Sequence, residues 1–405
     1  MKILLANKFF YLKGGAEAHF FDTAKLFERK GHEAIFFSMK HPHNLSSQYT
    51  RYFVSNIDYD KNGIKTNITA SLKLLYSFEA KGKIEQLIKD QKPDLVHLNN
   101  IYHQLSPSIL HAIKKHNLPI VMSLHDHKMV CPSYLLFFNK KICEACRGGR
   151  YYHCFLRGCV KKSRSKSLLN TIEMYLHHRI LHIYHFVDVF IAPSRALKSN
   201  LRRLGFKGNI VYLPNFINID EFEAQFTFRE NAIVYFGRLS REKGLDALME
   251  AVKDIKDVNL KIIGEGPKRK DLEEKAKEGK YRNVRFLGYK TGEELKHEIR
   301  ESMFTILPSE CYENNPLSII EAFALGKPAV GARIGGIPEL VKDGETGMTF
   351  EPGNIDDLRN TLLVMLKNPG MLFQMGKNAR DMVEKNYNAE SHYDNLMKIY
   401  ESLMI

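Results

Sequence analysis

The stretch that most constrains this chain runs from residue 305 to residue 350. It reads TILPSECYENNPLSIIEAFALGKPAVGARIGGIPELVKDGETGMTF, which is an apolar run, a polar turn, an apolar helical pattern, a second apolar run and a glycine-rich turn. This order predicts a strand, a helix that Pro316 opens from its first turn, and a second strand of a parallel sheet. Glu313 falls in the turn and Glu321, eight residues later, inside the helix. The free N–H groups and the dipole of such a helix start form a natural anion site.

The rest of the chain repeats this alternation of strands and helices, which is typical of doubly wound α/β domains. A chain of 405 residues that is 44% hydrophobic is long for one domain, so we expect two. The first domain is predicted to span residues 1–213 and the second residues 232–385, with a polar linker at 214–231. We expect strands at the following segments: 2–6, 33–38, 93–98, 119–124, 187–192, 210–213, 232–237 and 260–264.

Basic residues and glycines follow two of the strands expected in the second half. Arg238 and Lys243 come after the strand at 232–237, where ligands of parallel sheets bind and where cations balance a diphosphate. Gly264 and Gly266 follow the next strand. Arg269 stands where a dinucleotide fingerprint needs its third glycine, so a dehydrogenase is excluded.

Taken together, these motifs resemble a known enzyme family. They are Pro-Ser before Glu313, Asn315-Pro316-Leu317, Glu321-Ala, Gly-Lys-Pro, Gly335-Gly336-Ile-Pro-Glu339, Asp-Gly-Glu-Thr-Gly and the segment 236–244. In this order they resemble the retaining, nucleotide-sugar-dependent glycosyltransferases of family 4. The resemblance implies the GT-B architecture, in which two Rossmann-like domains face each other across a cleft and a last helix, here 386–405, packs back on the first domain.

The implied activity is transfer of a hexose-type sugar from a nucleotide diphosphate sugar to a hydroxyl group, with retention of configuration. The donor would be a UDP- or GDP-sugar and the acceptor a glycan or a polyprenyl-pyrophosphate-linked glycan of cell-surface polysaccharide synthesis. No cofactor is required, because cationic side chains supply the charge that balances the departing diphosphate. Two alternatives are a sugar-nucleotide epimerase of the same architecture and a non-catalytic subunit that binds sugar nucleotides. A glycoside hydrolase would have no use for the phosphate-binding residues.

The resemblance also implies roles for individual residues. The catalytic residues would be His125, Arg238, Lys243 and Glu313. The donor-binding residues would be Gly14, Gly15, Gly237, Gly264, Gly266, Asn315, Pro316, Leu317 and Glu321, with Glu17 beside them. Glu313 would bind hydroxyls of the donor sugar and Glu321 those of the ribose. The Gly14-Gly15 turn also fits a simple strand-to-helix turn, and a single histidine at the end of a strand also fits a structural role.

Five of the six cysteines fall between Cys131 and Cys159. Cys143-x-x-Cys146 has the spacing of a metal knuckle, and a reducing cytosol disfavours disulfides, so we expect a structural zinc. A subset of the family resembles this insertion, 131–159, which implies Cys131, Cys143, Cys146 and Cys159 as the zinc ligands, with His153 and Cys154 as substitutes. Unpaired thiols, disulfides and an iron–sulfur centre remain alternatives.

The net charge of +14 is concentrated in the first half of the chain. Residues 1–200 hold 30 Lys and Arg against 14 Asp and Glu, whereas residues 201–405 hold 30 against 32. This favours a cationic face that meets an anionic membrane or a pyrophosphate-linked acceptor, with a solvated surface as the alternative. A nucleic-acid partner is not expected, since the sharpest motifs lie in the neutral half.

A helix is expected in the segment 161–185. Its apolar residues at roughly helical spacing are Leu168, Leu169, Ile172, Tyr175, Leu176, Ile180 and Ile183. The stripe fits either a core contact or a surface that touches lipid headgroups.

No run of about 18 apolar residues is present, and the N-terminal apolar run is shorter than a signal-peptide core. We therefore expect a cytoplasmic protein, peripheral at most on the cytosolic face of the inner membrane. Asp58-Tyr59-Asp60 resembles a metal motif and the start of a calcium loop, but Thr69 stands where the loop needs its bidentate glutamate. We interpret this segment as a polar turn.

Overall fold

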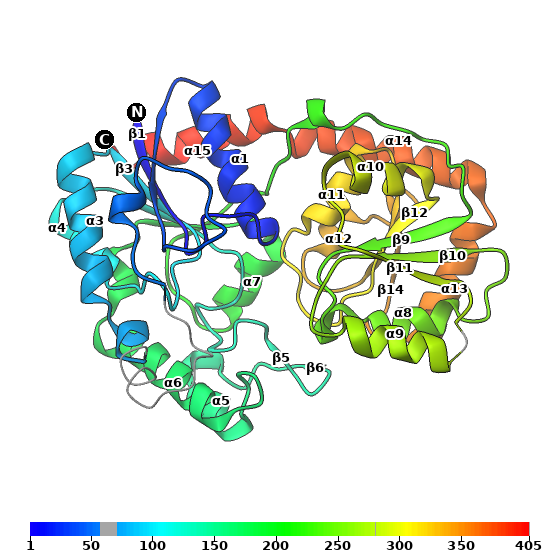
Figure 1. Cartoon of the computed structure of the whole chain (residues 1–405), viewed down its shortest axis with the longest axis horizontal. Coiled ribbons are helices and arrows are strands. Elements are labelled where there is room, and N and C mark those ends of the chain that lie inside the picture. The colour runs from blue at the N-terminus through cyan, green and yellow to red at the C-terminus, as the bar shows by residue number, and fades with distance from the viewer. Residues whose placement is uncertain (57–70, 280, 405) are drawn as a thin grey trace. The chain divides into compact units, whose positions relative to one another are not determined.

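The computed structural model describes residues 1–56, 71–279 and 281–404, and the chain divides into two compact units (Figure 1). Unit 1 comprises Met1–Leu136, Glu144–Pro214 and Tyr393–Ile405. Unit 2 comprises Phe137–Cys143 and Asn215–His392. The proposed polar turn at Asp58–Asp60, together with Thr69, lies outside the described residues.

Unit 1 is built on a six-stranded parallel sheet with the strand order β2-β1-β3-β4-β7-β8. The strands are β1 (Lys2–Ala6), β2 (Glu33–Phe37), β3 (Leu95–Leu98), β4 (Ile120–Ser123), β7 (Val189–Ala192) and β8 (Ile210–Tyr212). The helices that alternate with them are α1 (Gly15–Arg29), α3 (Phe78–Gln91), α4 (Ile109–Lys115) and α7 (Arg195–Arg203). The central strands are buried along their whole length, as expected for a parallel sheet covered on both faces.

Unit 2 repeats this plan with the strand order β11-β10-β9-β12-β13-β14. Its strands are β9 (Ala232–Phe236), β10 (Asn259–Ile263), β11 (Val284–Gly288), β12 (Phe304–Leu307), β13 (Ala329–Ala332) and β14 (Gly347–Phe350). Its helices are α8 (Leu245–Val252), α9 (Arg269–Glu278), α10 (Gly292–Glu301), α11 (Leu317–Ala324), α12 (Ile337–Leu340), α13 (Ile355–Leu366) and α14 (Pro369–Asn386). The predicted α/β class with two doubly wound parallel sheets is therefore confirmed.

In both sheets the order of connection reverses next to the first strand. The reversal lies between β1 and β3 in unit 1 and between β9 and β12 in unit 2. Open α/β sheets bind ligands in the crevice at the carboxyl ends of the strands that flank such a reversal. The segments that follow these four strands are therefore the places to look for a site.

Two helix starts were predicted from capping residues, and the structure differs from the prediction at one of them. Ser194 caps α7 as expected, since its hydroxyl accepts a hydrogen bond from Leu197 N at 3.0 Å. Pro316 precedes α11 as its N-cap residue instead of occupying the first turn. Helix α14 was not predicted from the sequence; it begins at Pro369, and proline is tolerated in a first helical turn.

The cysteine-rich insertion contains a hairpin and two helices. The hairpin pairs β5 (Phe137–Phe138) with β6 (Lys141–Ile142), and α5 (Tyr152–Arg157) packs against α6 (Arg164–Tyr175). The helix expected over 161–185 is thus shorter, and one π-helical turn, Leu176–Ile180, follows it. The residues of its predicted apolar stripe differ in burial: Ile183 is buried, whereas Leu168, Ile172 and Ile180 are exposed to solvent.

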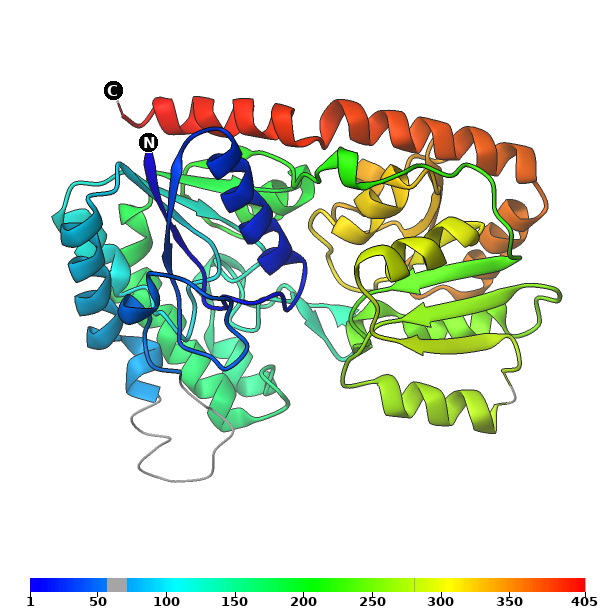
Figure 2. The same cartoon turned by 45° about the horizontal axis from the view of Figure 1, so that its top comes forward.

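The last helix, α15 (Ala389–Glu401), brings the C-terminal segment into unit 1 (Figure 2). Leu396 and Tyr400 are fully buried there, and the Tyr400 hydroxyl lies 2.6 Å from Nδ1 of His97 on β3. Among the described residues, no helix is both long enough and apolar enough to cross a membrane.

Candidate active site

Glu313 and Lys243 meet at the strand ends of unit 2. Glu313 lies between β12 and α11, and Lys243 lies between β9 and α8, so the two come from the strands that flank the reversal. Lys243 Nζ lies 2.5 Å from Glu313 Oε1, and Ser309 Oγ donates to the same oxygen at 2.5 Å. Burial by itself lowers the pKa of Lys243, but the Glu313 carboxylate outweighs it and holds this pKa well above its ordinary value. Lys243 is therefore a fixed cation.

A glycine allows the backbone of Glu313 to approach the turn after β13. Gly336 N donates to Glu313 O at 2.7 Å. The preceding Gly335 has φ +59°, and a Cβ there would lie 2.3 Å from the same carbonyl oxygen. Only glycine fits both the conformation and the space, so the Gly-Gly pair holds the Glu313 turn in place.

The residues expected at the start of α11 form a continuous turn. Asn315 is buried, Pro316 is the N-cap residue and Leu317 begins the helix. Asn215 N donates to Asn315 Oδ1 and Asn215 Nδ2 donates to Asn315 O, each at 3.0 Å. Glu321 is half-buried and lies about one helical turn beyond the first residues of α11. The structure thus places Glu313 and the free N–H groups of a helix start beside each other.

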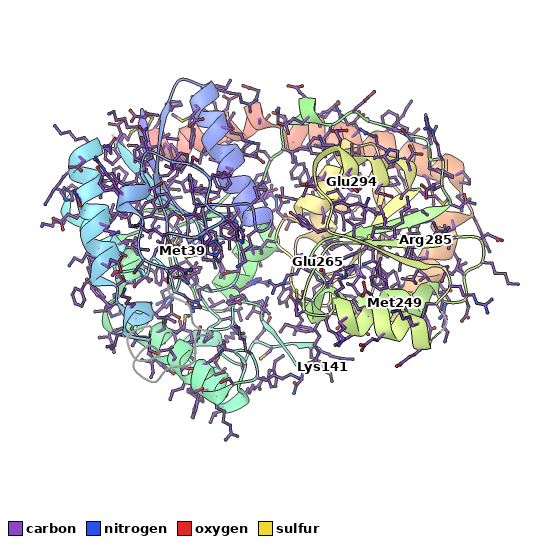
Figure 3. The ribbon with its side chains drawn as sticks, in the orientation of Figure 1. Met39, Lys141, Met249, Glu265, Arg285 and Glu294 are labelled. Atoms are coloured by element: carbon purple, nitrogen blue, oxygen red, sulfur yellow. The ribbon has the colours of Figure 1, made fainter. Side chains whose placement is uncertain are left out.

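The glycine turns after β9 and β10 pack on one another. A Cβ on Gly264 would lie 2.0 Å from Gly237 O, and one on Gly266 would lie 2.3 Å from Leu239 O. Leu239 N donates to the carbonyl of Glu265 at 2.9 Å, and Figure 3 marks Glu265 beside these strand ends. Gly264 and Gly266 are thus required for backbone packing and bring the turns together next to Arg238, whereas Gly237 is favoured as a glycine by its φ of +149°.

Arg238 is the exposed cation of this group. Within the part of the chain that the structure describes, its guanidinium forms no ion pair. Its backbone carbonyl accepts a hydrogen bond from the buried Tyr235 hydroxyl at 2.9 Å. The turn is therefore fixed while the charged end of Arg238 stays available to a ligand.

Gly14 and Gly15 lie where α1 of unit 1 begins. Gly14 is the N-cap residue in an extended conformation without a side-chain cap, and Gly15 is the first residue of the helix. The first turn carries Glu17, which is buried. Burial raises the pKa of Glu17 despite the opposing effects of Lys8 and Asn7. The first turn of α1 thus combines the two exposed glycines with the buried carboxyl group of Glu17.

His125 follows β4 and is half-buried. Burial, with smaller contributions from His19, His97 and Lys8, lowers the pKa of His125 to about 3, so the ring is neutral at pH 7. Its Nε2 lies 2.9 Å from Asn99 Oδ1, at the end of β3. An amide oxygen only accepts, so Nε2 carries the proton and Nδ1 keeps its lone pair.

Three residues in these contacts were not predicted from the sequence. They are Asn99, which orients His125; Asn215, which fixes Asn315; and Ser309, which holds Glu313. The signal available for Ser309 is its place in the same turn as Glu313. Asn99 and Asn215 lie 26 and 100 residues from their partners, so no local pattern marks them.

The cysteines do not form the zinc site expected from the sequence. None of the six forms a disulfide. Cys146 and Cys154 are buried in a cluster with Tyr151 and Met174, and Cys159 packs against it, whereas Cys143 groups with unit 2. In the described ranges, no three His, Cys, Asp or Glu side chains are arranged to hold a metal. The four predicted ligands therefore do not fit a zinc ion as they are placed.

Both units match models of glycosyltransferase families. Residues 13–221 match the family model described as Glycosyltransferase Family 4, and residues 218–382 match the one described as Glycosyl transferases group 1. An uncharacterised glycosyltransferase of Methanocaldococcus jannaschii is 25% identical over 336 residues, which cover 79% of this chain and 93% of the relative.

Solved structures share the fold over almost the whole chain. Sucrose-phosphate synthase from Thermosynechococcus elongatus superposes with a TM-score of 0.73 at 19% identity, covering 99% of this chain and 98% of that one. Anabaena HepE in complex with UDP superposes with a TM-score of 0.70 at 18% identity, covering 99% of this chain and 100% of that one. HepE has also been solved with UDP-glucose. With its two parallel-sheet units of GT-B type and a family model that spans half of its length, the chain belongs to glycosyltransferase family 4.

Proposed function

We propose that this glycosyltransferase moves a hexose from a nucleotide diphosphate sugar to a hydroxyl of a glycan or lipid-linked acceptor, with retention of configuration. The complexes of HepE with UDP and UDP-glucose support a nucleoside diphosphate donor, with UDP ahead of GDP. The observation that carries the proposal is the contact of Lys243, Glu313 and Ser309 at the start of α11.

The proposed reaction breaks the bond between the anomeric carbon and the diphosphate oxygen. The electron pair leaves with the diphosphate, so negative charge grows there while the sugar becomes positive. In this proposal Arg238, Lys243 and the first N–H groups of α11 stabilise that negative charge, and preorganised donors of this kind are usually the largest catalytic effect. Glu313 then binds hydroxyls of the sugar and Glu321 those of the ribose.

Retention follows if the acceptor hydroxyl attacks from the face that the diphosphate leaves. The new bond joins the acceptor oxygen to the anomeric carbon, and the hydroxyl proton passes to an oxygen of the departing diphosphate. His125 is neutral in this scheme, and its unprotonated Nδ1 accepts a hydrogen bond from a donor hydroxyl. The step needs no covalent enzyme intermediate and no charge from a metal ion.

A thermal-shift screen with UDP-, GDP-, ADP- and dTDP-sugars in the presence of EDTA tests the donor site. One nucleotide class should raise the unfolding temperature of the wild type, and Glu313→Ala and Lys243→Ala should reduce this shift. Lys270→Ala is the matched control, since Lys270 is an exposed lysine of the same unit. Donor binding that requires a divalent cation would contradict the metal-independent scheme.

The reaction itself is tested by incubating enzyme, the selected donor and candidate acceptors, followed by NMR of the anomeric centre in the product. We expect Glu313→Ala to lower kcat/KM by about 100-fold or more, as for loss of a preorganised polar contact. An inverted product would overturn the retaining mechanism. A new nucleotide sugar formed without any acceptor would instead identify an epimerase.

A further inference from the structure

The buried side of helix α6 is mostly polar, with Met174 as its apolar member, whereas two apolar residues are exposed on the other side. The buried residues include Ser167, Asn170, Thr171 and Glu173. Leu168 and Ile172, four residues apart on the opposite side, are 41% and 45% exposed. A surface helix of a globular protein normally shows the reverse arrangement.

Hydrogen bonds fix this orientation of α6. Ser167 Oγ accepts from Val160 N at 2.9 Å. Thr171 Oγ1 lies 3.3 Å from Tyr151 O and 2.8 Å from Ser167 O, and its one hydrogen is shared between these two acceptors. Glu173 is fully buried and lies 2.6 Å from the Lys128 amine. Rotating the helix to bury Leu168 would expose polar groups that now have partners, so the apolar side stays outward.

The exposed apolar residues continue onto the elements next to α6. Helix α5 lies alongside it at the margin of unit 1 in both views (Figures 1 and 2) and carries Tyr152 and Leu156, which are 45% and 60% exposed. Ile180, in the π-helical turn after α6, is 69% exposed. We call the exposed side chains of α5, of α6 and of Ile180 the α5–α6 surface.

The chain segment that carries most of this surface has charges of one sign. Residues 145–172 contain no Asp or Glu and seven cations, which are Arg147, Arg150, Arg157, Lys161, Lys162, Arg164 and Lys166. The carboxylates that bound this segment are engaged elsewhere: Glu144 pairs with Arg203 at 2.5 Å and Glu173 with Lys128. The field at the α5–α6 surface is therefore positive.

We propose that the α5–α6 surface docks onto an anionic lipid bilayer. Exposed apolar side chains in a segment rich in Lys and Arg match the boundary between acyl chains and anionic headgroups, as in helices that lie in a membrane interface. A second copy of the chain fits less well, because a twofold contact of this surface with itself would place seven cations against seven. The proposal does not rest on the proposed reaction, since docking needs no nucleotide sugar.

Flotation with lipid vesicles in the absence of nucleotide sugar tests the proposal. The wild type should float with vesicles of phosphatidylcholine that contain about one-third phosphatidylglycerol, and should not float with pure phosphatidylcholine. Leu168→Ser/Ile172→Ser should weaken partitioning about tenfold or more by removing buried apolar area. Lys161→Gln/Lys162→Gln/Arg164→Gln should weaken it about fivefold per charge, and added salt should act in the same direction.

Val364→Ser/Phe373→Ser is the matched control, because these apolar side chains of unit 2 are exposed to a similar degree. It should leave flotation unchanged, and unfolding midpoints should show that every variant is folded. Equal flotation with neutral vesicles, or unchanged flotation of Leu168→Ser/Ile172→Ser, would overturn the proposal. So would a wild type that ignores vesicles but dimerises, or binds an acidic protein, through the same residues.

Discussion

At the residue scale, several buried histidines make unit 1 sensitive to acid, and His97 and His19 are two of them. Burial, with a smaller effect of His19, lowers the pKa of His97 to about 3, and burial lowers that of His19 to about 4. Between these values and about 6.5 the unfolded chain binds more protons than the folded one, so stability is present above about pH 6.5 and falls on acidification. We expect a loss of about 2 kcal/mol per ring between pH 7 and pH 5, measured by urea unfolding.

His97→Gln should flatten this pH dependence, and His185→Gln is the control because His185 is exposed. The two variants must be compared through their slopes with pH, since His97→Gln also changes hydrogen bonds to Tyr400 and Ser123. A slope unchanged in His97→Gln would show that this ring is protonated in the folded protein.

Gly335 offers a sharper test of the turn that holds Glu313. Gly335→Ala would bring its Cβ within 2.3 Å of Glu313 O, whereas Gly353→Ala meets nothing within 4 Å, and both glycines have positive φ. Gly353→Ala should lose about 1 kcal/mol of unfolding free energy through backbone strain, and Gly335→Ala should lose more because its Cβ also clashes with the Glu313 backbone. Only Gly335→Ala should also lose donor affinity, by about tenfold or more in calorimetric titration. Equal donor affinity in the two variants would contradict a role of this close contact.

The chemical types of the site residues could be predicted from the sequence, whereas their partners could not. Lys243, Glu313 and the glycines lie in contiguous motifs, and the strand-end context tells why each type is needed. Asn99 and Asn215 act through contacts made only when distant strands and turns come together. Such contacts have no local pattern, because register and packing decide them.

At the element scale, the Lys128–Glu173 pair anchors α6 to the segment that follows His125. Both side chains are fully buried, and Lys128 N also donates to Asp126 Oδ1 at 2.8 Å. Burial by itself raises the pKa of Glu173, but Lys128 and His103 outweigh it and keep this pKa well below its ordinary value. The pair is therefore ionised inside the unit.

Glu173→Leu should cost about 3–5 kcal/mol of unfolding free energy, because it leaves the Lys128 charge buried without its partner. Lys128→Met/Glu173→Leu should cost clearly less than the sum of its single changes. The matched pair is Lys270–Glu274, which is exposed, and its neutralisation should change stability by less than about 1 kcal/mol. Additive costs at Lys128 and Glu173 would show that their charges do not interact.

Most strands were predictable as elements because runs of buried β-branched and aliphatic residues identify them almost to the residue, as for β1 and β9. Strands β11 and β14 were not predicted, and β11 is only partly buried, so it lacks such a run. The orientation of α6, by contrast, could not be predicted from the sequence. Its apolar stripe fits a core contact equally well, and only the tertiary partners of Ser167, Thr171 and Glu173 decide which side is buried. The periodicity of the sequence predicts that the helix has an apolar and a polar side, but the hydrogen bonds of the polar side decide which of the two is buried.

At the scale of the whole molecule, α15 closes the core of the unit in which the chain begins. The Tyr400 hydroxyl is the partner of His97 Nδ1, and Tyr400 is fully buried. Tyr400→Phe should lower the unfolding free energy by about 1–3 kcal/mol, because it leaves a buried ring nitrogen without its partner. Tyr289→Phe, at an exposed tyrosine, should have no measurable effect. Equal stabilities of the two variants would contradict this role of Tyr400.

The packing of α15 on unit 1 affects the order in which the two units can complete their folding during synthesis. Domains generally fold as they leave the ribosome, with the N-terminal one first. Here Leu396 and Tyr400 leave the ribosome only after the part of the chain that forms unit 2. Until then, the part of the unit 1 core that they cover is exposed. Of the two units, the one synthesised first is thus completed last, and a nascent chain stalled before residue 393 would present an unfinished unit 1 to chaperones.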